Sequence, residues 1–203
     1  MDAITATNNG VTFFEKMSEV EYNNLLYQIS KRLDELDVGD QLLFLWRGKV
    51  TDHGEENIPT RSLIKELEDN GFLSSDRLVL LKRVLKVVEE WTLFQQVEKF
   101  EAKRKEYSRL LEKTVRVLDE LNDLERLVSI CRGKITVERQ GNIHDVGSLF
   151  KELELNDWLG IDCLETLKEI LAQTEKIDLL NEVEEFEQRL SRELKFERRK
   201  GIH

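Results

Sequence analysis

The chain has 203 residues, of which 40% are hydrophobic and 35% are charged, and its formal net charge is −10. This composition is too apolar for a disordered acidic tail and too charged for a membrane protein. The negative charge argues against broad nucleic-acid binding, although it leaves room for a local basic patch. One proline and 10 glycines leave few helix breakers among abundant Leu, Glu, Lys and Arg, so an all-helical protein is expected.

Apolar residues in the first half of the chain recur at steps of three and four, which is the helical period. The expected helices are centred on residues 25–33, 42–46, 63–67, 78–85 and 93–100. The irregular segment 51–61 has room for a short sixth helix. Gly71 follows KELEDN and is expected to end a helix in the left-handed conformation. Trp91 and Trp158 are expected to pack in the core or between the domains, with the core preferred, and an interface anchor is the alternative.

The pattern occurs twice in the chain. Residues 22–50 align without a gap with residues 107–135, and 11 of these 29 pairs are identical. After one inserted residue, residues 62–101 align with residues 148–187, with 19 identities in 40 pairs. The segments LDEL, RGK, KELE and VExFE recur in both copies. The repeat predicts two homologous domains of about 85 residues each.

The alignment predicts four segments along the chain. They are an N-terminal extension over 1–19, a first domain over 20–104, a second domain over 105–192 and a basic tail over 193–203. The linker AKRKE contains no Gly, Pro or Ser. The last helix of the first domain should therefore run directly towards the first helix of the second domain, and the two domains should dock rigidly.

The sequence shows none of the common catalytic or metal-binding motifs. His53, His144 and His203 lie far apart, and there is no HExxH, GxxxxGK[ST], GxSxG or GxGxxG motif. Cys131 and Cys163 lack metal-ligand spacing and fit small core residues in a reducing compartment. With no basic leader and no apolar run of about 20 residues, a noncatalytic, cytoplasmic protein without cofactor or metal is expected.

The six-helix unit, with RGK after its second helix, a KELE helix and a closing DLLxxVExFE, resembles the death effector domain. The pattern covers about residues 22–104 and 107–192. Two such units in tandem resemble the prodomains of apical caspases and the FLICE-like inhibitory proteins. The resemblance implies two tandem six-helix death-fold bundles and control of apoptosis. It also implies homotypic binding to the death effector domains of the Fas-associated adaptor or initiator procaspases, and self-association or filaments, without nucleic acid or membrane insertion.

The resemblance implies an exposed Phe-Leu pair on the second helix as a first interaction surface. The first domain has Phe44 and Leu45 at these positions, whereas the second domain has Ser129 and Ile130. Phe44 is expected at the surface or in an interdomain contact, and Leu45 towards the core. Plain core packing of both residues is the alternative.

A second implied surface is a charge triad, with an acid early in the second helix facing an Arg-x-Asp-Leu on the last helix. The second domain resembles it with Asp123, Lys176 and Asp178, although lysine lacks the planar clamp of arginine. The first domain departs from it, with Val38 and Glu90 at the matching positions. The alternative for the triad is a solvated ion pair within the domain, worth about 0 to 1 kcal/mol.

The predicted function is a noncatalytic regulator of death-receptor-type signalling that acts by competition or co-assembly. No QACxG signature of a caspase is present. One alternative is the prodomain of a longer initiator caspase, since KFERRKGIH reads as the start of a linker. Another is a structural helical scaffold without apoptotic partners.

Overall fold

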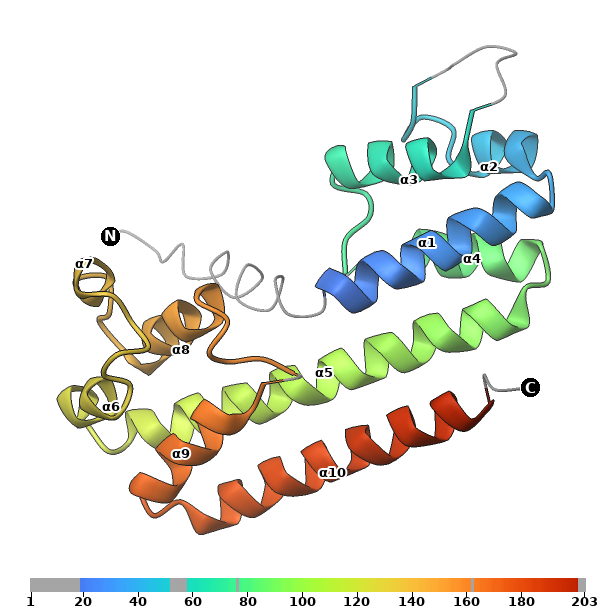
Figure 1. Cartoon of the computed structure of the whole chain (residues 1–203). Helices are drawn as coiled ribbons and strands as arrows, with labels where there is room; N and C mark the ends of the chain where they lie inside the picture. The colour runs from blue at the N-terminus through green and yellow to red at the C-terminus, as the bar shows by residue number, and fades with distance from the viewer. Residues whose placement is uncertain (1–18, 52–57, 76, 162, 201–203) are drawn as a thin grey trace. The chain divides into compact units, whose positions relative to one another are not determined.

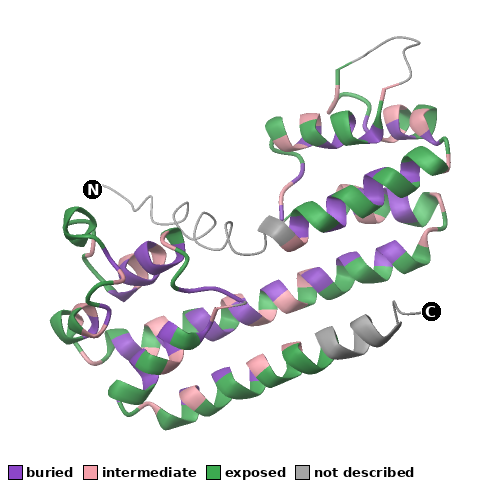
Figure 2. Cartoon of the chain, in the orientation of Figure 1, coloured by how far each residue is buried: buried purple, intermediate pink, exposed green. Residues whose placement is uncertain are grey.

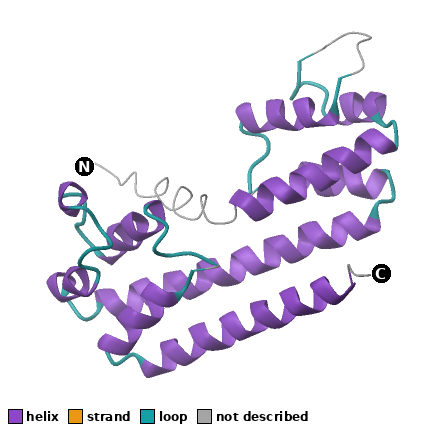
Figure 3. Cartoon of the chain, viewed as in Figure 1, coloured by secondary structure: helices purple, strands orange, loops and turns teal. Residues whose placement is uncertain are grey.

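The structure is a computed structural model that describes residues 19–51, 58–75, 77–161 and 163–200. The described residues form helices joined by turns, and they contain no strand (Figure 3). This confirms the all-helical expectation. The chain divides into two compact units, and the boundary between them falls between Lys105 and Glu106. We call these the first unit and the second unit, and each is described by itself.

The described residues of the first unit form four complete helices and the beginning of a fifth (Figure 1). These helices are α1 (Glu19–Glu35), α2 (Gly39–Leu45), α3 (Thr60–Asp69), α4 (Val79–Val87) and the first part of α5 (Trp91–Asp119). Helices α1, α3 and α5 cover their expected ranges, whereas α2 ends one residue before the end of its range and α4 begins one residue after the start of its range. Helix α1 packs against α3. Most of the segment expected to hold a short extra helix lies outside the described residues.

Where the structure describes it, the second unit comprises the remainder of α5 and five further helices. They are α6 (Leu124–Ile130), α7 (Val137–Gln140), α8 (Val146–Leu155), α9 (Glu165–Gln173) and α10 (Ile177–Lys200). The one-turn α7 occupies the stretch that aligns with the irregular segment of the first copy. Helix α9 packs against both α6 and α10.

Helix α5 is continuous over 29 residues and passes through the linker between the two copies (Figure 1). Leu93, Val97 and Phe100 belong to the core of the first unit. Tyr107 and Leu111 further along the same helix belong to the core of the second unit. The linker residues AKRKE favour helix and contain no breaker, which confirms the expectation that the last helix of the first copy runs straight on.

Each unit has its own core of buried apolar side chains. The ribbon is purple at buried residues in Figure 2. A ring pair recurs between the first helix of each copy and its last helix. The centroids of Tyr22 and Phe100 lie 6.2 Å apart, and those of Tyr107 and Phe186 lie 6.4 Å apart. Burial of such apolar surface is the main force that favours the folded state.

The expectation of core packing for Trp91 and Trp158 is wrong. Trp91 is 55% exposed at the start of α5, and Trp158 is 43% exposed in the loop after α8. The fully buried tryptophan is Trp46, which follows α2, and the aligned residue of the second unit is Cys131, also buried. Hydropathy identifies apolar side chains, but their orientation at a helix end depends on the neighbouring chain.

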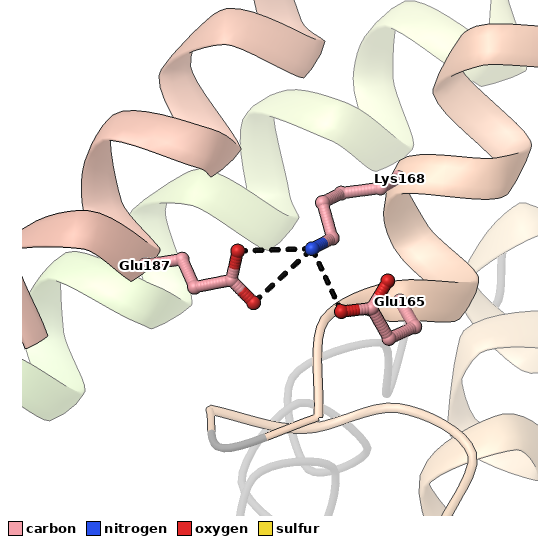
Figure 4. Close-up of polar contacts among 3 residues, drawn as sticks. All are labelled: Glu165, Lys168 and Glu187. Atoms are coloured by element: carbon pink, nitrogen blue, oxygen red, sulfur yellow. Dashed lines mark hydrogen bonds and ion pairs between the residues drawn. The ribbon is translucent and has the colours of Figure 1, made fainter. Parts of the chain in front are cut away.

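A lysine–glutamate pair joins the last two helices of each copy. In the first unit, Lys82 lies 2.6 Å from Glu101. In the second unit, Lys168 contacts Glu187 at 2.9 Å and also Glu165 at 2.8 Å (Figure 4). Burial opposes the charge of Lys168, but hydrogen bonds to the two carboxylates raise its pKa above the ordinary value. These aligned contacts give both copies the same helix pairing.

Candidate protein-interaction surfaces

Helix α2 holds Phe44 at the surface of the first unit. Leu42 is buried, and Leu43 and Leu45 are partly buried against the core. Successive residues of a helix turn by about 100°, so Phe44 lies roughly opposite Leu42 and is 75% exposed. Phe44 therefore lies at the surface and Leu45 lies towards the core, as the sequence led us to expect.

The aligned helix α6 presents no such ring. Ser129 is exposed at the position of Phe44, and Ile130 is partly buried against the second core. The exposed aromatic side chain is therefore a property of the first copy alone. An exposed phenylalanine that meets a partner can contribute binding energy through loss of apolar surface to water.

The structure gives Asp123 a local role at the start of α6. Its side chain accepts a hydrogen bond from the backbone N–H of Arg126 at 3.2 Å and so caps the helix. The Arg126 guanidinium donates to the backbone carbonyl of Gln173 at 2.6 Å. That contact joins the start of α6 to the end of α9, only three residues before Lys176.

Lys176 and Asp178 flank the start of α10. Lys176 is partly exposed and its backbone N–H donates to Leu171. Asp178 is exposed in the first turn, where a negative charge suits the helix dipole. No ion pair between described residues joins Asp123 to Lys176. The three charges therefore remain open to solvent rather than closing into a network within the unit.

The first unit reverses the charge at one of these positions. Glu90, which aligns with Lys176, accepts from the Arg32 guanidinium at 2.8 Å. In the second copy, Val117 aligns with Arg32. This ion pair was not predicted from the sequence. The repeat indicates it, because Glu90 and Arg32 are both replaced in the second copy.

A metal-binding group and a membrane-spanning helix are two further features that would bear on function. In the part of the chain that the structure describes, no three His, Cys, Asp or Glu side chains come together in a group that could hold a metal ion. None of the described helices combines the length with the apolar composition needed to cross a membrane. His144 is exposed, while His53 and His203 lie outside the described residues.

Comparison with protein families gives a match in the first unit. Residues 22–103, which run from within α1 through α4 into the first part of α5, match the family model of the death effector domain. Death effector domains are interaction domains of apoptosis signalling that bind other death-fold domains homotypically, and they are generally non-catalytic. No curated protein and no solved structure matches the chain. The match supports a death effector domain in the first copy.

Proposed function

We propose that the chain is a noncatalytic, cytoplasmic regulator of death-receptor signalling. It binds the death effector domains of the Fas-associated adaptor or of initiator procaspases. The observation that carries this proposal is the exposed ring of Phe44 on α2, within the matched residues. Burial of such a ring contributes about 1.5 to 3 kcal/mol before the costs of association.

We further propose that residues 105–192 form a second death effector domain after the first, over 20–104. Support comes from the repeat and from the aligned contacts, such as the ring pair of Tyr107 with Phe186 and the Lys168–Glu187 pair. In this domain Asp123, Lys176 and Asp178 form a charged docking surface, because their side chains are at least partly open to solvent.

The chain would regulate signalling in one of two ways. It would occupy adaptor sites and so compete with procaspase recruitment, or it would co-assemble with these partners as a scaffold. The two modes differ in a filament assay with the adaptor and the prodomain of an initiator procaspase. An inhibitor shortens or prevents filaments, whereas a scaffold seeds them.

Co-precipitation of the purified chain with the adaptor's death effector domain tests the apolar surface. Phe44→Ala is expected to weaken binding at least tenfold. The matched control is Val137→Ala, which removes an apolar side chain that is 82% exposed on α7 and should leave binding within about twofold. Failure of the wild-type chain to bind either partner would contradict the proposal and favour a structural scaffold.

The charged surface needs variants that keep the helix caps. Asp123→Asn removes the charge but retains a capping side chain, and Lys176→Met keeps the length of the stem. The pair is expected to weaken binding about tenfold, while Arg109→Gln, a change of an exposed cation on α5, should not. If the double variant and the Arg109→Gln control weaken binding equally, the charges of Asp123 and Lys176 interact only with solvent and do not bind the partner.

A further inference from the structure

The Arg-Gly-Lys turn after the second helix is the same in both copies in sequence and in backbone. Gly48 has φ +74° and Gly133 has φ +87°, a left-handed conformation that explains glycine at both positions. Isolated bridges join Arg47 to Val50 and Arg132 to Ile135. The backbone thus accounts for the glycine, but it does not account for the arginine.

The side chain of the arginine in the turn has no partner side chain among the described residues of either unit. Arg47 and Arg132 are both exposed. Neither forms an ion pair or a side-chain hydrogen bond with any residue in the described part of the chain. A charged side chain that recurs without an internal partner is a candidate for an external one.

In the first unit this turn adjoins an exposed aromatic ring. The Lys49 ammonium lies 5.9 Å from the centroid of Phe72, which is 38% exposed. Asn70 donates from its side chain to the carbonyl of Lys49 at 3.0 Å. Arg77 donates from its guanidinium to the carbonyl of Gly71 at 2.7 Å. The two contacts of Lys49 join the turn after α2 to the loop after α3, and the hydrogen bond of Arg77 lies within that loop.

We call Arg47, Lys49, Phe72 and Arg77 the basic-aromatic surface. None of its three cations is paired with a carboxylate of the described residues. This lack is unexpected in a chain whose acidic residues outnumber its basic ones, 41 to 31. Cations that have no such ion pair among the described residues, placed around an apolar ring, provide both charge and contact area for a ligand.

The second unit has lost this combination. Lys134, which aligns with Lys49, is paired with Glu169. Cys163 stands at the position of Arg77, while Trp158 keeps the aromatic character of Phe72. The second copy therefore offers an internal control, with the same turn and ring but fewer available cations.

We propose that the basic-aromatic surface docks an acidic segment of a partner protein, with carboxylates on the cations and an apolar side chain against Phe72. This contact differs from homotypic binding through Phe44. Arginine and lysine bind carboxylates through charge-assisted hydrogen bonds. The net charge of −10 disfavours long polyanions such as nucleic acid, because their repulsion extends beyond the local cluster.

Fluorescence anisotropy of the full chain with a labelled dodecapeptide, Glu-Glu-Leu repeated four times, tests the proposal. A peptide with Gln in place of Glu and a 12-nucleotide single strand of DNA serve as comparisons. The acidic peptide should bind at least tenfold more tightly than either. Its affinity should also fall between low and high salt, since these charges are exposed.

Two variants separate charge from fold. Arg47→Gln with Lys49→Gln should weaken peptide binding at least tenfold, and it leaves the Arg77 contact with the Gly71 carbonyl in place. Arg132→Gln with Lys134→Gln should leave it within about twofold. A thermal melt confirms that both remain folded. Phe72→Ala should weaken binding about fivefold.

Three results would overturn the proposal: no binding of the acidic peptide to the wild-type chain, equal binding of the neutral peptide or DNA, or equal losses in the two charge variants. Adaptor binding is measured separately with the same proteins. Because Phe44→Ala should affect the adaptor and spare the peptide, the two proposals fail independently.

Discussion

The two copies keep their internal contacts and differ at their surfaces. Both have the tyrosine–phenylalanine ring pair and the lysine–glutamate pair between the last two helices. By contrast, Phe44 is replaced by Ser129, and Glu90 by Lys176. Close packing restricts what a core position accepts, whereas an exposed position changes at little cost. If the two copies bind different partners, we expect the surfaces that differ to make the contacts.

The largest expected effect comes from exchanging the core residue that differs between the copies. Trp46 and Cys131 are aligned and each is 1% exposed. Trp46→Cys should destabilise the chain by about 3 kcal/mol, because it leaves a cavity in the first core. Urea unfolding followed by circular dichroism measures this loss. A loss below about 1 kcal/mol would show that the first core collapses around the smaller residue.

A second difference should emerge at alkaline pH. Burial raises the pKa of Cys131 from 9.0 to about 11, with Lys134 lowering it and Glu169 raising it. The unfolded thiol ionises first, so stability present below pH 9 should be lost between pH 9 and about 11, by about 2 kcal/mol. In the Cys131→Ala variant, the part of this alkaline loss of stability that is due to the thiol should be absent. Parallel pH profiles of urea midpoints for the two proteins would contradict the expectation.

The stability that the lysine–glutamate pairs contribute should differ moderately between the copies. Lys168 binds two carboxylates, whereas Lys82 binds Glu101 and has Val79 at the position of Glu165. Lys168→Met should cost about 1 kcal/mol and Lys82→Met about 0.5 kcal/mol, since these pairs are only partly buried. Thermal melts of the two variants at low and high salt measure the difference. A larger cost for Lys82→Met would reverse the ranking.

The smallest effect on stability is expected at the surface that we assign to binding. Phe44→Ser gives the first copy the residue of the second, and it should change the free energy of unfolding by no more than about 0.5 kcal/mol, because Phe44 is 75% exposed. Adaptor binding should nevertheless fall. A destabilisation above about 2 kcal/mol would instead indicate that Phe44 packs within the chain.

Local patterns predicted much of the fold and part of the candidate site. The spacing of Leu63, Ile64 and Leu67 predicted α3, and the same three side chains are buried. The identical logic assigned Leu45 to the core side of its helix and Phe44 to the surface or to an interdomain contact. It failed for Trp91 and Trp158, because helix ends and loops have no period that specifies which side chain turns inwards.

The helical class, the repeat and the helix through the linker were all predictable from residue patterns, because they depend on short-range periodicity and on the absence of breakers. Which charges meet became known only from the packing of the helices. It paired Arg32 with Glu90 and placed Asp123 on the backbone N–H of Arg126. Exposed ion pairs differ by less than about 1 kcal/mol, so the choice among them depends on how the helices pack and not on the residues alone.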